Sequence, residues 1–174
     1  MAGPFATGAV GAGTGATVAK WRGPGESRPG GLGSATRTGP DGVVVAALIA
    51  CNAWGEPRGA DQAAVPSPGA PGPWDERADP FANTTIGVIA TNARLDKAAC
   101  LLVAQSGHDG LARALEPVHA AVDGDALVAV ATCDVELPAP GGPVAVEVVR
   151  ALAAAAVEDA TLGAVPGKTE RADR

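Results

Sequence analysis

The sequence predicts an α/β fold. From residue 84 onward, a strand-like run at 84–91, a helical period from 95, a second apolar run at 125–132 and a final helical stretch at 143–159 follow in turn. Strand, helix, strand, helix is the order typical of a sheet covered by helices. The 174 residues fit one domain, and a hydrophobic content of 47%, mostly Ala and Val, predicts a core of small, closely packed side chains. We therefore expect residues 1–174 to form a single domain.

The first part of the chain predicts strands after a glycine-rich opening. Residues 8–20 are rich in Gly, residues 30–38 form a short β-type run, and the β-branched run at 42–54 is the best strand candidate. Between residues 55 and 80, Pro and Gly are dense and no hydrophobic period is present. This composition predicts a flexible linker.

The second part begins with the strand at 84–91 and continues into a long helix. One apolar face of that helix is predicted at i, i+3, i+4, i+7 and i+8 by Leu95, Ala98, Ala99, Leu102 and Val103. We expect a break at Gly107 or Gly110 before the helix ends near Pro117. The final helix has Pro143 in its first turn, where proline is favoured.

Charge and cysteine content exclude some classes of partner. The chain has 13 basic and 19 acidic residues, a net charge of −6, and no cluster of Lys and Arg, so nucleic-acid binding is not expected. The three cysteines are far apart in apolar runs, which predicts free thiols and a cytoplasmic location. No leader pattern and no membrane-length apolar run is present, so we expect no membrane association.

Two motifs suggest chemistry but fit it poorly. Residues 11–16, GAGTGA, satisfy a dinucleotide-binding pattern, yet the preceding run is weakly apolar and the expected acidic residue is missing. A turn where two backbones approach closely is favoured. His108, Asp109 and His119 lack a standard ligand spacing, so a helix break with capping side chains is favoured over a metal site or a relay. We expect no cofactor and no metal.

The start of the strand at residue 84 carries the best chemical candidate. A threonine hydroxyl needs a base, and the smallest is its own α-amine, whose pKa is about 8 but which exists only at a chain start. Thr84 could acquire that amine if its hydroxyl attacked the carbonyl of Asn83 and the resulting ester were hydrolysed. From the residues alone, a loop end with Asx-type hydrogen bonds is the simpler interpretation.

Two carboxylates precede the strand at 125–132. Asp123 and Asp125 are two residues apart, so strand alternation would place them on the same side, where they could orient or protonate a group. An exposed tight turn is the ordinary alternative.

Five blocks in order carry a resemblance to a known family. They read GAVGAGTGATVAKW, GGLGSAT, VAALIACNAWGE, NTTIGVIATNARLDKAAC and AQSGHDGLARALEPVHAAVDGDALVAVAT, and together they cover most of residues 8–132. Through them the chain resembles the P1-type (DmpA-like) peptidases, which include β-peptidyl aminopeptidases and nylon-oligomer endohydrolases. The resemblance implies an αββα sandwich of the DmpA and ornithine acetyltransferase type, related to N-terminal-nucleophile hydrolases.

The same resemblance implies a precursor that cleaves itself into two subunits. Residues 1–83 would be a partial α-subunit segment that ends in the linker, and residues 84–174 the β-subunit segment. Family chains are considerably longer and carry a tyrosine at the site, whereas this chain contains no Tyr. We therefore expect the sandwich to be incomplete.

The resemblance also assigns roles to individual residues. Thr84 resembles the nucleophile and Asn83 the residue whose carbonyl is attacked. Lys20 resembles a lysine beside the nucleophile, and Asn52 an asparagine that binds the oxyanion. Asp123 and Asp125 resemble an acidic pair that positions the nucleophile and its amine. The threonine and the DGD triplet resemble the nylon-hydrolase branch.

The function implied is hydrolysis of peptide or amide-oligomer bonds through an acyl-Thr84 intermediate, with a small peptide or amide as substrate. Two alternatives stay open: a catalytically inactive, truncated remnant acting as a structural or interaction module, and an acyltransferase of the same fold. We also expect a homo-oligomer, formed through an apolar, Ala-rich surface on the last helix.

Overall fold

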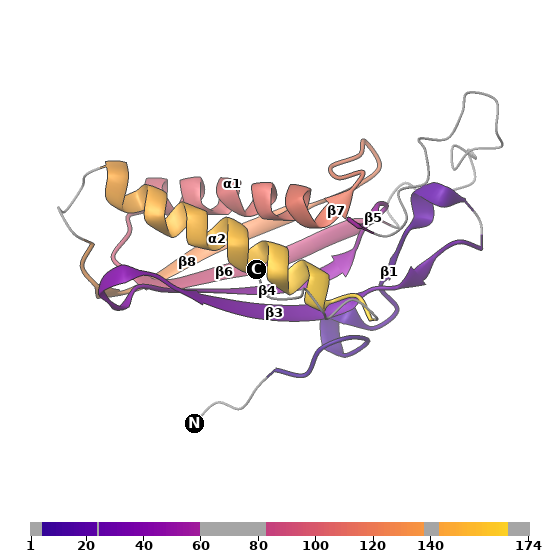
Figure 1. The fold of residues 1–174 in the computed structure, drawn as a ribbon, viewed down its shortest axis with the longest axis horizontal. Helices are drawn as coiled ribbons and strands as arrows, with labels where there is room; N and C mark the ends of the chain where they lie inside the picture. Colours follow the sequence, from indigo (N-terminus) through magenta and orange to yellow (C-terminus); the bar gives the residue numbers. More distant parts are fainter. Residues whose placement is uncertain (1–4, 24, 60–82, 138–142, 167–174) are drawn as a thin grey trace.

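The structure is a computed structural model, and it describes residues 5–23, 25–59, 83–137 and 143–166. Two helices lie together on one face of a four-stranded sheet (Figure 1). In spatial order the strands are β3 (Gly31–Thr38), β4 (Val44–Asn52), β6 (Thr84–Ala93) and β8 (Ala126–Val135), and the helices are α1 (Lys97–Ala114) and α2 (Pro143–Gly163). The predicted order of strands and helices is confirmed, with boundaries shifted by a few residues.

The direction of the strands decides which residues meet at each end of the sheet. β4 is antiparallel to both β3 and β6, and β6 is parallel to β8, which it reaches through α1. Asn52 at the end of β4 therefore pairs with Thr84 at the start of β6. An isolated parallel bridge joins Asn83 to Asp123, just ahead of the paired part of β8. Every residue to which the sequence assigned chemistry in these three strands lies at this one end.

The core lies between the sheet and the two helices. Alternate residues of β4, namely Val45, Ala47 and Ile49, are buried, as the period of a strand with one covered face requires. The helices contribute buried side chains that include Val103, Leu111, Val149, Ala153 and Val157. Small residues predominate, in agreement with the composition.

The expected break in α1 is wrong, because its two glycines pack instead of interrupting the helix. A Cβ on Gly107 would lie 2.5 Å from Cδ1 of Ile89, and one on Gly110 would lie 2.3 Å from the carbonyl oxygen of Ala154. Both glycines let α1 approach the sheet and α2 more closely than any larger residue could. His108 and Asp109 therefore lie inside the helix, and the interpretation of these two as capping residues at a break is also wrong.

The apolar face predicted for α1 is only partly buried. Val103 is fully buried, whereas Leu102 is 40% exposed. The face of α1 that packs against the core contains Gly107 and Gly110, and a pattern of hydrophobic residues does not count glycine. At the N-terminus, the side chain of Asp96 accepts a hydrogen bond from the Ala99 N–H at 2.7 Å, which caps the helix.

The opposite face of the sheet carries exposed apolar side chains. Ile86 and Val88 on β6 are 49% and 40% exposed, and Val128 and Val130 on β8 are 55% and 49% exposed. Val88 and Val128 are direct register partners. Both described helices lie on the other face (Figure 1). We call these four residues the outer apolar face.

The last helix does not offer the apolar surface expected of it. Its alanines at 153, 154, 156 and 160 are buried against the sheet and α1. That expectation is wrong because the small side chains of α2 are used for close packing inside the domain.

The segments before β3 form a lobe at the end of the sheet where β6 begins. It contains two short 3-10 turns, η1 (Gly11–Gly13) and η2 (Lys20–Arg22), and the pair of two-residue strands β1 (Thr17–Val18) and β2 (Arg28–Pro29). A Cβ on Gly13 would lie 2.3 Å from the Leu32 nitrogen, so the glycine-rich stretch allows close backbone approach, as predicted. A third turn, η3 (Pro40–Gly42), joins β3 to β4.

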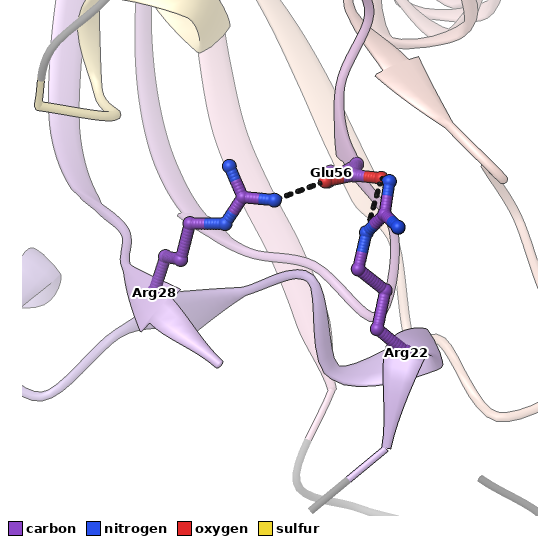
Figure 2. A network of polar contacts seen from close by, with 3 residues as sticks. All are labelled: Arg22, Arg28 and Glu56. Carbon is purple, nitrogen blue, oxygen red and sulfur yellow. Dashed lines mark hydrogen bonds and ion pairs between the residues drawn. The ribbon is translucent and has the colours of Figure 1, made fainter. Parts of the chain in front are cut away.

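The predicted linker begins with structure. β5 (Glu56–Pro57) pairs with β7 (Leu115–Glu116), which follows α1, and residues 60–80 lie outside the described residues. Glu56 is 4% exposed and forms ion pairs with Arg22 and Arg28 (Figure 2). Two guanidinium groups satisfy this buried carboxylate, which fixes η2 and β2 against β5.

Two further expectations concern the whole chain. Cys51, Cys100 and Cys133 are all free thiols, as predicted, although only Cys51 is fully buried. Among the described helices, none combines the length and apolarity that crossing a bilayer would require.

Candidate active site at the start of strand β6

Thr84 is placed by the first rung of β6, directly after Asn83. Its hydroxyl donates a hydrogen bond to the carbonyl oxygen of Asn83. The backbone N–H of Gly124 donates to the same oxygen at 3.0 Å. The carbonyl that self-cleavage would attack is therefore polarised by two donors.

Gly124 also leaves space for the Thr84 hydroxyl. A Cβ at this position would lie 2.8 Å from Thr84 Oγ1, closer than real Cβ contacts come. The φ of Gly124 lies outside the left-handed region, so the backbone itself does not demand glycine there. The requirement for a small residue comes from the hydroxyl.

Asn52 faces Thr84 across the sheet and holds Lys20. Its side-chain oxygen accepts hydrogen bonds from the Thr17 N–H at 3.0 Å and from Lys20 Nζ at 2.8 Å. Lys20 Nζ also donates to the Asn52 carbonyl oxygen at 2.9 Å. Because both partners are donors, the side-chain atom of Asn52 that they contact is the oxygen Oδ1. The other amide atom is therefore the NH2 group, which can donate a hydrogen bond to an oxyanion.

Lys20 is kept in place by a strained turn. Ala19, just before it, is fully buried and has a φ of 65°, a conformation that is costly for a residue other than glycine. The Ala19 N–H donates to the Gly55 carbonyl oxygen at 2.7 Å, which ties the turn to the loop after β4. Burial lowers the pKa of Lys20 from its usual value near 10.5 to about 8, and nearby Asp123 opposes this change. The pKa of this lysine is therefore closer to neutral than that of an exposed lysine.

Asp123 is held at the same end of the sheet by the loop after β4. Its carboxylate accepts a hydrogen bond from the Trp54 N–H at 3.0 Å. Burial raises the pKa of this carboxyl, and the Trp54 hydrogen bond and the charge of Lys20 work against the increase. Asp125 adds a like charge nearby that also raises the pKa of Asp123.

Asp125 contacts the residue that follows the candidate nucleophile. Its Oδ1 accepts from the Thr85 N–H at 2.8 Å, and its Oδ2 lies 2.8 Å from Nδ1 of His119. The sequence did not predict this contact of His119, because the two residues are joined by a turn that no periodic pattern describes. The DGD triplet at residues 123–125 was the only feature of the sequence that marked this turn as part of a site.

A competing nucleophile at this end of the sheet can be set aside. Cys51 is the register partner of Thr85, but burial raises the pKa of its thiol to about 11. A neutral buried thiol is a poor nucleophile.

The structure thus gathers all six predicted site residues at one end of the sheet. Lys20, Asn52 and Thr84 form one side, and Asp123 with Asp125 the other. Neither carboxylate is hydrogen-bonded to the Thr84 side chain: Asp125 binds the Thr85 N–H, and Asp123 binds the Trp54 N–H in the loop after β4. In the described part of the chain, no group of three metal-ligating side chains comes together.

Comparison with known proteins places the chain in a family. The family model described as Peptidase family S58 matches residues 1–170. An uncharacterized aminopeptidase of Mycobacterium leprae is 38% identical over 149 residues, which are 77% of this chain and 39% of that protein. A 6-aminohexanoate-oligomer endohydrolase of Kocuria sp. is 38% identical over 60 residues, 34% of this chain and 17% of the relative.

Solved structures show the same fold. A β-aminopeptidase of Burkholderia sp. superposes with a TM-score of 0.69 at 28% identity, covering 94% of this chain and 47% of that one. An L-aminopeptidase D-Ala-esterase/amidase of Ochrobactrum anthropi, described as a variant of the Ntn-hydrolase fold, gives a TM-score of 0.64 at 22% identity and supports the fold alone. The predicted Ntn-hydrolase fold class is confirmed, and the chain spans less than half the length of these relatives. With its family model matched over residues 1–170, the chain belongs to peptidase family S58.

Proposed function

We propose that this chain is a self-cleaving amide hydrolase whose nucleophile is Thr84. The observation that carries the proposal is the Asn83–Thr84 peptide bond: its carbonyl oxygen accepts hydrogen bonds from both the Thr84 hydroxyl and the Gly124 N–H. Hydroxyl and carbonyl are therefore already adjacent, with a backbone donor where negative charge would develop.

The self-cleavage step is an acyl shift from nitrogen to oxygen. Thr84 Oγ1 forms a bond to the Asn83 carbonyl carbon, the C–N bond to Thr84 breaks, and the nitrogen takes the proton that the hydroxyl loses. Water then hydrolyses the ester, leaving a carboxylate on Asn83 and a free α-amine on Thr84. Lys20, whose pKa is about 8, is the site's candidate for the transient base.

The same groups serve the hydrolysis of a second amide. The Thr84 amine acts as the base for its own hydroxyl, and an acyl-Thr84 ester forms and is cleaved by water. The Asn52 NH2 is the proposed oxyanion donor, while Asp125 fixes the backbone directly after the nucleophile and Asp123 fixes the loop after β4. The substrate class is a short peptide or amide oligomer, as the names of the M. leprae and Kocuria relatives suggest.

The mass of the purified 174-residue chain tests this proposal. We expect two pieces, residues 1–83 and 84–174, in the wild type and in Thr84→Ser, and one uncut chain in Thr84→Ala. A wild-type chain that stays whole after long incubation contradicts the proposal and favours an inactive structural module.

Two wider properties belong to the same proposal. Free thiols at all three cysteines suit a cytoplasmic location. The outer apolar face suits association, and we expect a homo-oligomer. Light scattering that reports a monomer at micromolar concentration would contradict the second property.

A further inference from the structure

The turn between β7 and β8 presents an imidazole to one of the site carboxylates. His119 Nδ1 lies 2.8 Å from Oδ2 of Asp125, whose side chain is only 5% exposed. The other oxygen of that carboxylate accepts the Thr85 N–H at 2.8 Å. Both carboxylate oxygens are thus occupied, one by the imidazole and one by the backbone directly after Thr84.

The Thr85 hydrogen bond replaces a rung of the sheet. Regular pairing of β6 with β8 begins at Ile86 and Ala126, one residue further along each strand. At Thr85 the backbone N–H is bound by the Asp125 side chain instead of a strand carbonyl. The first residues of β6 are paired with β4 on one side, and Asp125 holds them on the side that faces β8.

The backbone of His119 is held in a conformation that few residues adopt. Its φ is 52°, in the left-handed region, which is uncommon for residues other than glycine, although Asn, Asp and His adopt it more often than the rest. Strained conformations of this kind persist where surrounding contacts fix them, and they concentrate at functional sites. Here the conformation directs the imidazole at Asp125.

The opposite side of the imidazole is supported from α1. The rings of His108 and His119 have centroids 4.9 Å apart with an interplanar angle of 57°. Burial, followed by the proximity of His119, lowers the pKa of His108. The His108 ring supports the His119 ring from the side of α1.

We propose that His119 is a positioning residue for Thr84: its Nδ1–H holds Asp125 in the rotamer that binds the Thr85 N–H, and so fixes the start of β6. This inference rests on the proposed function of Thr84. The His119 contact itself concerns the backbone of β6, and it can be measured whether or not the chain is cleaved.

Three substitutions at residue 119 separate the hydrogen bond from the backbone. Asn, Asp and Gly all accept the left-handed conformation. Asn places an N–H donor close to the position of Nδ1, Asp has the same size but no such donor, and Gly removes the side chain. His119→Asn is thus the rescue, and His119→Asp its matched control.

The first readout is hydrogen exchange at the Thr85 amide, measured by NMR in chains that also carry Thr84→Ala. We expect exchange to rise at least about tenfold in His119→Gly and His119→Asp, and to remain near the parent value in His119→Asn. The second is the nitrogen-15 spectrum of His119, which reports which ring nitrogen carries the proton. We expect the proton on Nδ1, and a change of tautomer in Asp125→Asn.

The third readout is the self-cleavage rate of chains with Thr84 intact. A displacement of 1 Å costs about 100-fold in rate, so we expect a 10- to 100-fold loss in the Gly and Asp variants and recovery in the Asn variant. Unchanged Thr85 exchange, or a proton on Nε2 in the parent chain, overturns the positioning role. Exchange that responds as expected in a chain that never cleaves supports the positioning of β6 while refuting self-cleavage.

Discussion

Gly124→Ala tests whether the space beside the Thr84 hydroxyl is needed for the chemistry. The added Cβ would lie 2.8 Å from Thr84 Oγ1, whereas ordinary contact begins at 3.4 Å, so the hydroxyl must retreat by about 0.6 Å. Because the φ of Gly124 is not left-handed, alanine adds no backbone strain. The perturbation is therefore directed at the nucleophile.

The expected magnitude follows from that displacement. A 1 Å misplacement of a reacting group costs about 100-fold in rate, so 0.6 Å corresponds to roughly 10- to 20-fold, or about 1.6 kcal/mol in the barrier. The Gly124 N–H remains, so its hydrogen bond to the Asn83 carbonyl is retained. The self-cleavage rate of Gly124→Ala should therefore fall without being abolished.

The assay is the time course of intact mass for wild type, Gly124→Ala and a matched control. Gly163→Ala is that control, because a Cβ there meets nothing within 4 Å and its φ is also not left-handed. The control should cleave like the wild type and gain up to about 1 kcal/mol in unfolding free energy at the helix end. Cleavage of Gly124→Ala at the wild-type rate would refute the placement of the attacking hydroxyl beside Gly124.

Four further substitutions, one of them with a matched control, follow from the site and its support. Lys20→Met should remove a rising limb of the pH–rate profile centred near pH 8. Because the pKa of Lys20 is lower in the folded chain than in the unfolded chain, the wild type should gain stability between about pH 8 and 10.5, and the variant should lose that gain in pH-dependent urea unfolding. Asn52→Ala should lower kcat for a peptide amide by about 100-fold or more with a smaller change in KM, because an oxyanion donor acts in the transition state. Asp123→Asn should leave the fold intact and slow cleavage, read by mass. Glu56→Gln should destabilise the chain by about 2–3 kcal/mol, since it uncouples two arginines from a buried carboxylate, whereas Glu136→Gln, in an exposed pair, should change stability by under about 1 kcal/mol.

Sequence patterns were sufficient for the four strands of the main sheet and for the last helix. Alternating burial along β4 and the β-branched start of β6 are local signals, and each of these four strands lies where its pattern predicts. The two-residue strands, including β5 inside the predicted linker, carry no such pattern. α1 shows where such reasoning ends. Gly107 and Gly110 signal a break when read locally, whereas in the fold they are the points of closest approach between layers. Only the residues that surround a glycine in the folded chain show whether it interrupts a helix or allows close packing.

The candidate site was predictable as a set of residues but not as a set of contacts. The resemblance named Lys20 and Asn52, and their hydrogen bond agrees with a shared location. The partners of Asp125 were not predictable, because both depend on the exact end of the β6–β8 pairing. Glu56 was also missed, since a single acid in a Pro- and Gly-rich stretch has no pattern that marks it as buried.

The outer apolar face has a consequence for how the chain behaves in solution. Val88 and Val128 lie side by side in register, and Ile86 and Val130 extend the same surface along the strands. An exposed apolar surface favours self-association. At high protein concentration it should bind an environment-sensitive dye and promote precipitation as the salt concentration is raised. The substitutions Val88→Thr and Val128→Thr would keep the β-branched shape that strands favour while reducing the exposed apolar area. The pair of substitutions is therefore a practical route to a preparation suited to the NMR measurements.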